Sequence, residues 1–359
     1  MLLDKEFKLM KKKGLMTIAL LAALHMQAQE VTTYTPGTME EGVVYYLPKT
    51  LLEIKVTASK NKYTPGELCQ YANRYLKLQD VSAQPSEEWS IKTIEVNTIG
   101  IPDITKAYSI KLKDKSVASQ VELTEDGIIK AINTTTPKEK PVKKDVEPEL
   151  PKRLDPRSFM TEEILMAGST NKMAELVAQE IYSIRESKNN LTRGQADYMP
   201  QDGAALKIML NNLEIQEKAM TEMFTGITEI TDHTFTFYVE PTKNFEEQIL
   251  FRFSKKLGLL ETNNLAGEPI FIAISDESAL PEADEAAKAN KKLAGIIYNI
   301  PGKGRVSIES IDKSFYEDEH HVAQFGETEV LVNDLFNKKI NTRVIFNPTT
   351  GGIVKIDKD

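Results

Sequence analysis

Gly42-Val43-Val44-Tyr45-Tyr46-Leu47-Pro48, near the start of the chain, returns near its end as Gly295-Ile296-Ile297-Tyr298-Asn299-Ile300-Pro301. Alternating strand-like residues follow each block. Each copy then runs on to a Gly-Ile-[Ile/Val]-Lys ending, at residues 127–130 in the first and 352–355 in the second. Such a density of β-branched and aromatic residues is typical of strands. The same features in the same order, twice, predict two related β modules in one chain.

The first module also contains a helical pattern that the second lacks. Strands are expected at Val43–Leu47 and Leu51–Thr57, with Pro48 ending the strand's ladder because proline has no N–H to donate. Residues Glu67–Leu78 place apolar side chains on one face of a helix. A hairpin of Val121–Leu123 and Ile128–Ile132 closes the module. The second copy is shorter by about this helix and its loops, so we expect it to have no helix there.

A helical hairpin and further strands are predicted between the modules. Apolar residues recur at helical spacing over Met173–Ile184 and Leu206–Phe224. Asp202 is placed to cap the second helix, and Gly226 follows its end. Phe235–Val239 and the residues after Gln248 then alternate with period two, which is typical of a half-buried sheet.

These patterns predict an α+β fold, with two related, mostly antiparallel β modules bracketing an inserted helical hairpin and further strands. The expected segments are a signal peptide (1–28), an N-terminal β-rich module with one helix (29–133), a proline-rich charged linker (134–158), the helical hairpin (159–226), the middle strands (227–292) and a C-terminal β module related to the first (293–359).

The first residues resemble an export signal. Lys11-Lys12-Lys13 precede an apolar stretch, Gly14–Leu24, and Ala28 offers a small residue for cleavage. The apolar stretch is shorter than the roughly 20 residues that a membrane-spanning helix needs. We therefore expect a cleaved signal, no transmembrane span afterwards, and residence in the periplasm or cell envelope.

The net charge argues against some classes of partner, and the cysteine count limits disulfide bonding. The formal net charge is −8, and removal of residues 1–28 would make the chain still more acidic. Nucleic acid and anionic membrane surfaces attract basic patches, so neither is expected to bind. Cys69 is the only cysteine, which excludes an intramolecular disulfide. Its apolar neighbours, among them Leu68, predict a buried structural thiol.

Few residues carry a chemical signal. Glu317-Asp318-Glu319-His320-His321 could bind a divalent metal, but neighbouring residues of a strand point to opposite faces, which favours a solvated acidic edge. His233 beside Asp232 has no recognisable nucleophile setting. Surface pairing with lysines is the expected role of the carboxylates Glu214, Glu217 and Glu222.

Arg185 lies on the flank of the first helix, where an ion pair with Glu217 is favoured over a site for an anionic ligand. No catalytic residue, metal ligand or cofactor is assigned from the sequence. The residues at which a ligand or partner would be sought are Arg185, Glu217, Asp202, His320 and His321.

Four stretches carry a resemblance to a known family: Gly42–Pro48, Ile184-Arg185-Glu186-Ser187, Pro200-Gln201-Asp202-Gly203, and Glu217 through Phe224-Thr225-Gly226. The chain resembles, over nearly its whole mature length, a family of exported Bacteroidetes proteins catalogued only as a domain of unknown function. The resemblance implies envelope or periplasmic residence and no particular activity.

The leading hypothesis is a non-enzymatic binding or scaffold component that engages an envelope protein or surface glycan. One alternative is a hydrolase-type enzyme with an unrecognised carboxylate pair, which would need a cleft with strongly shifted pKa values. Another is a small-ligand carrier, which would need a dry internal pocket. The sequence does not fix the oligomeric state.

Overall fold

The computed structural model describes residues 29–33, 42–112, 120–137, 154–200, 202–278, 295–332 and 342–358. The predicted signal peptide (1–28) and residues 138–153 of the predicted linker lie outside them. Within them, most of the regular structure is strand, arranged in three antiparallel sheets. The expected α+β class is therefore wrong, and the fold is mostly β.

The strands are longer than the sequence patterns predicted. The first sheet has the order β1-β3-β2-β6, and all its pairs are antiparallel. Its strands are β1 (Gln29–Thr33), β2 (Val43–Thr64), β3 (Ser86–Leu112) and β6 (Ile227–Val239). The alternation of buried and partly exposed residues along β2 shows why this segment is a strand, since one of its faces lies in the core.

Two further sheets complete the β structure. The order β11-β10-β9-β7-β8 is made by β7 (Gln248–Ser254), β8 (Gly258–Leu260), β9 (Glu268–Asp276), β10 (Gly295–Glu309) and β11 (Ser314–Val332). The order β13-β12-β5-β4 is made by β4 (Val121–Leu123), β5 (Ile129–Ile132), β12 (Thr342–Phe346) and β13 (Ile353–Lys358). The predicted segments thus share sheets, because β6 joins the first hairpin and β5 pairs with β12.

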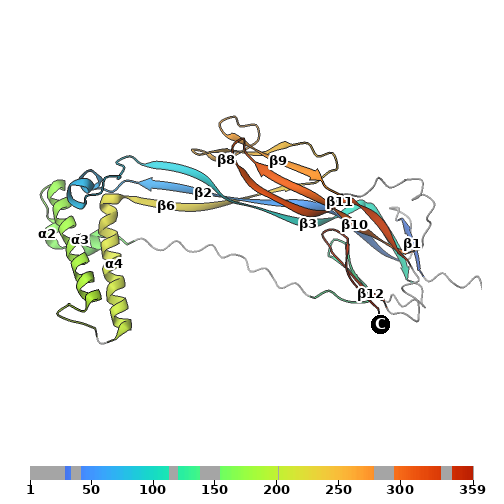
Figure 1. Ribbon diagram of the computed structural model, residues 1–359, viewed down its shortest axis with the longest axis horizontal. Helices are drawn as coiled ribbons and strands as arrows, with labels where there is room; N and C mark the ends of the chain where they lie inside the picture. The colour runs from blue at the N-terminus through green and yellow to red at the C-terminus, as the bar shows by residue number, and fades with distance from the viewer. Residues whose placement is uncertain are drawn as a thin grey trace, which may run out of the picture.

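Helices gather at one end of the molecule (Figure 1). They are the short helices η1 (Cys69–Tyr71), η2 (Ala72–Leu76), η3 (Pro156–Phe159) and α2 (Glu162–Leu165), and the long helices α3 (Thr170–Arg193) and α4 (Gly203–Thr225). The predicted helix over Glu67–Leu78 is replaced by η1, a 3₁₀ turn, and η2, a π-helical turn. Lys77 ends η2 with φ 59°, a conformation that no α-helix continues.

Three clusters of buried side chains form the core. The first two sheets pack face to face as a sandwich around residues such as Ile54, Ile272 and Ile308. A second cluster around Phe224 holds the helices together. The third lies where all three sheets meet, and it includes Tyr45, Ile296 and Phe346. The molecule is consequently elongated, with the helices at one end and the three-sheet junction toward the other (Figure 1).

Equivalent hydrogen bonds relate the two predicted modules. The amide of Tyr46, the fifth residue of the first block, donates to the carbonyl of Gly127 at 2.9 Å. The amide of Asn299, the fifth residue of the second, donates to the carbonyl of Gly351 at 3.2 Å. Both acceptor glycines have positive φ, 84° and 76°. The closing glycine of the second copy is therefore Gly351, one residue earlier than the sequence match placed it.

The prolines of the blocks do not end their strands. β2 runs on through Pro48, which pairs with Pro102. Between Tyr46 and Pro48, two steps along β2 face five along β3, from Ala107 to Pro102. The same bulge occurs in the second module, where two steps from Ile300 to Gly302 face five from Glu327 to Val322. A bulge interrupts the ladder, so a proline without an N–H is tolerated beside it.

The connections of the two hairpins differ. Strands β10 and β11 are joined by a tight turn in which the amide of Ser310 donates to the carbonyl of Lys313 at 2.8 Å. Strands β2 and β3 are separated instead by residues 65–85, which carry η1 and η2. The second module has no helix at this position.

The two repeated blocks contact one another. The hydroxyl of Tyr45 accepts from the amide of Ile297 at 3.0 Å and donates to the same residue's carbonyl at 3.1 Å. The side-chain amide of Asn299 donates to the carbonyls of Pro48 and Thr350, both at 3.0 Å. The repeated sequence is therefore the joint of the scaffold.

Candidate functional site

The helices and the loops around them form a helical head, defined as the described residues of 65–85 and 154–226. Its core joins Leu68 and Leu76 to the apolar faces of α3 and α4 around Phe224, which is fully buried. The packing explains part of the predicted amphipathic patterns, because α3 up to Ile184 and α4 from Ala219 turn their apolar residues inward. Cys69, expected to be buried, is only partly so.

The head is fixed to the sheet through the end of α4. Gly226 has φ 73° and leads directly into β6, and a side chain there would clash with the carbonyl of Thr64. The hydroxyl of Tyr63 lies 2.8 Å from the carbonyl of Ser82 and 3.0 Å from that of Thr225, so it can donate to either. The amide of Leu68 donates to the carbonyl of Met223 at 2.8 Å. These contacts hold the head in a set orientation on β2 and β6.

Midway along the helical hairpin, one carboxylate receives two cations. Arg185 Nε lies 2.7 Å from Glu217 Oε1, and Lys188 Nζ lies 3.0 Å from Glu217 Oε2. Partial burial raises the pKa of Glu217, but the hydrogen bonds from Arg185 and Lys188 outweigh it and leave that pKa below its ordinary value. The expected Arg185–Glu217 ion pair is thus present, and it links α3 to α4.

Beyond this ion pair the two helices have little to pack against. We call the described residues of 189–216 the distal arm. No residue of α4 before Ala219 is buried, and Leu191 is the only buried residue of α3 after Ile184. Tyr198 is 83% exposed and Ile208 63% exposed, and Met199 and Met209 are also open to solvent. The arm lies at the end of the helical hairpin farthest from the sheets (Figure 1).

The α4 part of the distal arm carries few charges and is exposed. From Gly203 to Gln216 the only charged residues are Lys207 and Glu214. A helix that is apolar on more than one face is usually covered on more than one face. This part of α4 is therefore exposed to solvent although its composition is typical of a covered helix.

Asp202 serves as a helix cap. Its side chain accepts a hydrogen bond from the amide of Ala205 at 2.6 Å, and Gly226 closes the other end of α4. Both positions agree with the capping predicted from sequence. With its carboxylate committed to the helix N-terminus, Asp202 is a structural residue of the arm.

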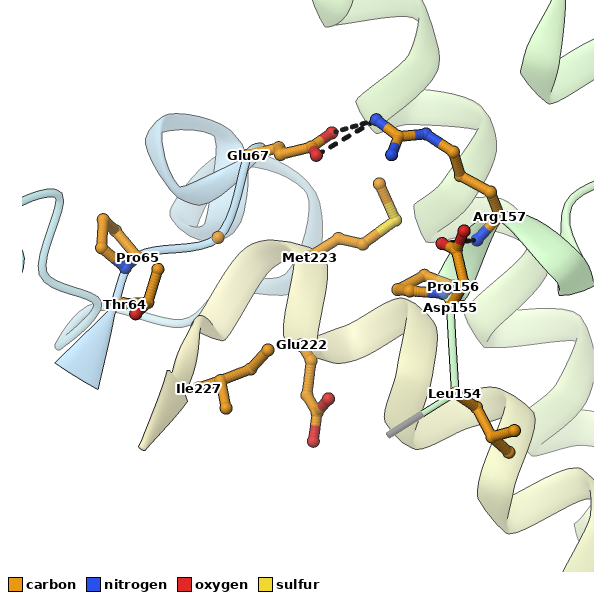
Figure 2. A pocket seen from close by; sticks show the side chains of 11 residues that line it. Thr64, Pro65, Glu67, Leu154, Asp155, Pro156, Arg157, Glu222, Met223 and Ile227 are labelled. Atoms are coloured by element: carbon orange, nitrogen blue, oxygen red, sulfur yellow. Dashed lines mark hydrogen bonds and ion pairs between the residues drawn. The ribbon is translucent and has the colours of Figure 1, made fainter. Parts of the chain in front are cut away.

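Two open cavities flank the base of α4 and share Glu222 and Ile227 in their walls. One, of about 490 Å³, lies between the loop after β2 and the segment leading into η3. Figure 2 shows Arg157 reaching Glu67 across it, with N–O distances of 3.1 and 3.2 Å. The other, of about 570 Å³, is bordered by Arg185 and Glu217. In both, the prominent charged groups are paired with each other.

His233 and Asp232 point away from each other. His233 packs at a tilt against Trp89, with 5.1 Å between ring centres, on the face of the first sheet that packs against the second sheet. Asp232 lies on the opposite face and receives Lys92 Nζ at 2.6 Å. These hydrogen bonds, from Lys92 first and then Ser59, lower the pKa of Asp232. A nucleophile–His–Asp arrangement is therefore not formed by this pair.

His320 and His321 are separated in the same way by strand alternation. His320 Nε2 lies 2.7 Å from the hydroxyl of Tyr316, and burial lowers the pKa of His320. On the other face Arg305 bridges Glu277, at 2.6 Å, and Glu317, at 3.1 Å. Among the described residues, no three His, Cys, Asp or Glu side chains come together as metal ligands do. Of the candidate residues, only Arg185 and Glu217 lie together.

Sequence reasoning missed two features. The strand residues Tyr63, which contacts the head, and Trp89, which packs on His233, received no role, because no local pattern distinguishes a strand aromatic residue that anchors a neighbouring element from one that fills a core. The exposure of the distal arm was missed as well, since its helical periodicity equally fits packing against a neighbour. The low charge of Gly203–Gln216 was the signal that could have indicated it.

The three sheets and the helical head together make this an elongated, mostly β protein with helices at one end. The chain belongs to the family described as Domain of unknown function (DUF4831), whose match covers residues 41–354. No curated protein and no solved structure matches the chain. In the part of the chain that the structure describes, no helix has the length and apolar character needed to cross a membrane.

Proposed function

We propose that this protein is an exported component of the cell envelope, in the periplasm or at the surface, that binds a protein partner through the distal arm. The observation that carries the proposal is the arm itself. It combines exposed Tyr198 and Ile208 with a helix of low charge and no buried residue before Ala219. Exposed apolar surface of this kind is typical of interaction sites.

The scaffold suits this role. Strands β2, β3 and β6 run from the sandwich to the head, which places the arm at one end of the molecule (Figure 1). The ion pair of Glu217 with Arg185 and Lys188 ties the arm's two helices together at its base. A partner would therefore meet a pre-organised pair of helices, which lowers the entropic cost of binding.

The apolar side chains of the arm indicate what kind of surface the partner presents. The exposed apolar side chains of the arm, among them Tyr198, Ile208 and Met209, pair best with an apolar groove or with the apolar face of another helix. A surface glycan, which presents mainly hydroxyl groups, matches these side chains less well. Export is supported by the basic and apolar stretches at Lys11–Lys13 and Gly14–Leu24.

Site-specific photocrosslinking tests the proposal. A photoreactive phenylalanine analogue at Ile208 in the full chain, expressed in its native cells, should yield a discrete protein adduct. The matched control is the same analogue at Leu265, which is 82% exposed on the loop between β8 and β9. Adducts of equal yield at both positions, or none at Ile208, would reject the distal arm as the binding surface.

A further inference from the structure

The first two sheets follow one plan, apart from one strand. The first has the order β1-β3-β2-β6 and the second begins β11-β10-β9. The shared bulges make β2 the counterpart of β10 and β3 the counterpart of β11. β6 and β9 then pair with the opposite edges of β2 and β10. Outside β11, where the first sheet has β1, no strand lies among the described residues.

The register locates this open edge. In the first module Tyr45 pairs with Tyr108, which also pairs with Thr33 of β1. In the second, Tyr298 pairs with Glu329. Glu329 is therefore the counterpart of Tyr108. The part of the β11 edge that corresponds to the β1 site begins at Glu329 and continues through Val330-Leu331-Val332. An open strand edge of apolar residues is a template for pairing with a further strand.

The segment of the second module that corresponds to β1 has a poor strand sequence. In the first module β1 comes from the residues that precede Gly42, and these include Val31, Thr32 and Thr33. The corresponding residues before Gly295 are 279–294, which contain no β-branched or aromatic residue. Strand propensity thus argues against this segment as a counterpart of β1.

We propose that Gln29–Thr33 of a second copy adds to β11 as an antiparallel strand, with Thr33 opposite Glu329 and Val31 opposite Leu331. In their own chain these residues pair with the counterpart edge, from Thr33 opposite Tyr108 to Gln29 opposite Leu112, so addition in trans exchanges that pairing for the β11 edge of another copy. Strand addition supplies main-chain hydrogen bonds whatever the side chains, so a segment suited to one edge suits its duplicate. The contact is head-to-tail and can link copies in series.

Disulfide trapping between two differently tagged proteins tests the proposal. Both carry residues 29–359 with Cys69→Ser, one with Thr33→Cys and the other with Glu329→Cys. Mixed under mild oxidation, they should form the hetero-disulfide about tenfold faster than Thr33→Cys forms one with Ser314→Cys, since docking raises the effective concentration of the two thiols. Ser314 lies at the other end of β11. The double variant Thr33→Cys, Tyr108→Cys checks that β1 tolerates the substitution.

The outcome is decided by two readouts. If the single-chain control forms its disulfide while Glu329→Cys reacts no faster than Ser314→Cys, strand addition in trans is wrong. Light scattering on the chain with native residues provides the second readout. Oligomers at micromolar concentration that are lost when residues 29–33 are deleted would support the proposal, whereas a monomer at every concentration would overturn it.

Discussion

Single glycines set the two closing turns at the residue scale. Gly127 and Gly351 both have positive φ, and both offer their carbonyls to the fifth residue of a repeated block. Around Gly351 the space is also tight, because a Cβ would lie 2.8 Å from Asn299 Nδ2 and 2.9 Å from Pro48 Cδ. Backbone conformation and packing therefore both require glycine there.

Alanine at Gly351 and at Gly194, a second glycine with positive φ, should separate the cost of backbone conformation from the cost of packing. Gly194→Ala, at φ 69° with nothing within 4 Å of the added Cβ, should cost about 1 kcal/mol from backbone conformation alone. Gly351→Ala should cost clearly more, since Asn299 or Pro48 must also move. Urea unfolding of both variants measures the difference. Equal losses would mean that the junction is more loosely packed than the structure indicates.

The hydroxyl of Tyr45 links the two repeated blocks, and burial raises its pKa. Tyr45→Phe leaves the amide and carbonyl of Ile297 without this partner. Because an orphaned buried polar group costs about 1–3 kcal/mol, we expect a loss of stability in that range by chemical unfolding. Tyr238→Phe, on an exposed side chain, is the matched control and should be near neutral. A neutral Tyr45→Phe would contradict the role given to this contact.

At the element scale the head and the sandwich have separate cores. Phe224 belongs to one and Ile308 to the other. Phe224→Ala should cost about 3–5 kcal/mol, as for other buried aromatic side chains, and the loss should be local. Hydrogen exchange should speed up in α3 and α4 while β10 stays protected, and Ile308→Ala should do the reverse. Acceleration of both regions by either variant would show a single cooperative unit.

The ion pair at Glu217 gives the head a pH dependence. The folded-state pKa of Glu217 lies below its ordinary value of 4.5, so its contribution is present above that pH and is lost as pH falls through the lowered pKa. The wild type should therefore lose more head stability on acidification than Glu217→Gln. Thermal unfolding of α3 and α4 at pH 7 and in the acid range measures this. Parallel losses would contradict the assignment.

Local signals explain which elements were predictable. The caps at Asp202 and Gly226 and the periods of α3 and α4 depend on near neighbours in sequence, so they could be predicted. The helix over Glu67–Leu78 failed because the left-handed Lys77 ends it early. Pro48 was taken as a strand end because the bulge that accommodates it belongs to the partner strand, which local reasoning cannot see.

At the scale of the whole molecule, the repeated blocks predicted two related β modules, but the pairing of distant strands could not be predicted. Equivalent hydrogen bonds link the two blocks to their closing turns. Neither the insertion of β6 beside β2 nor the pairing of β5 with β12 leaves a local pattern, since both join residues far apart in sequence. The α+β prediction failed for the same reason, because the joined strands are longer than their separate signals.

The open β11 edge also lies toward the end of the molecule opposite the helical head (Figure 1). If both proposals hold, strand addition would repeat along the envelope while each copy presents its own distal arm. Deleting residues 29–33 should then abolish assembly and leave the Ile208 adduct intact. Loss of that adduct on deletion would show that partner binding depends on assembly.

The central claim is that the repeated sequence is a duplicated structural joint. An experimental structure at atomic resolution tests it most directly. We predict hydrogen bonds from Tyr46 N to Gly127 O and from Asn299 N to Gly351 O, each beside a bulge of two steps against five, with the same strand order in both modules. A different strand order, or one block without its bond and bulge, would contradict the claim.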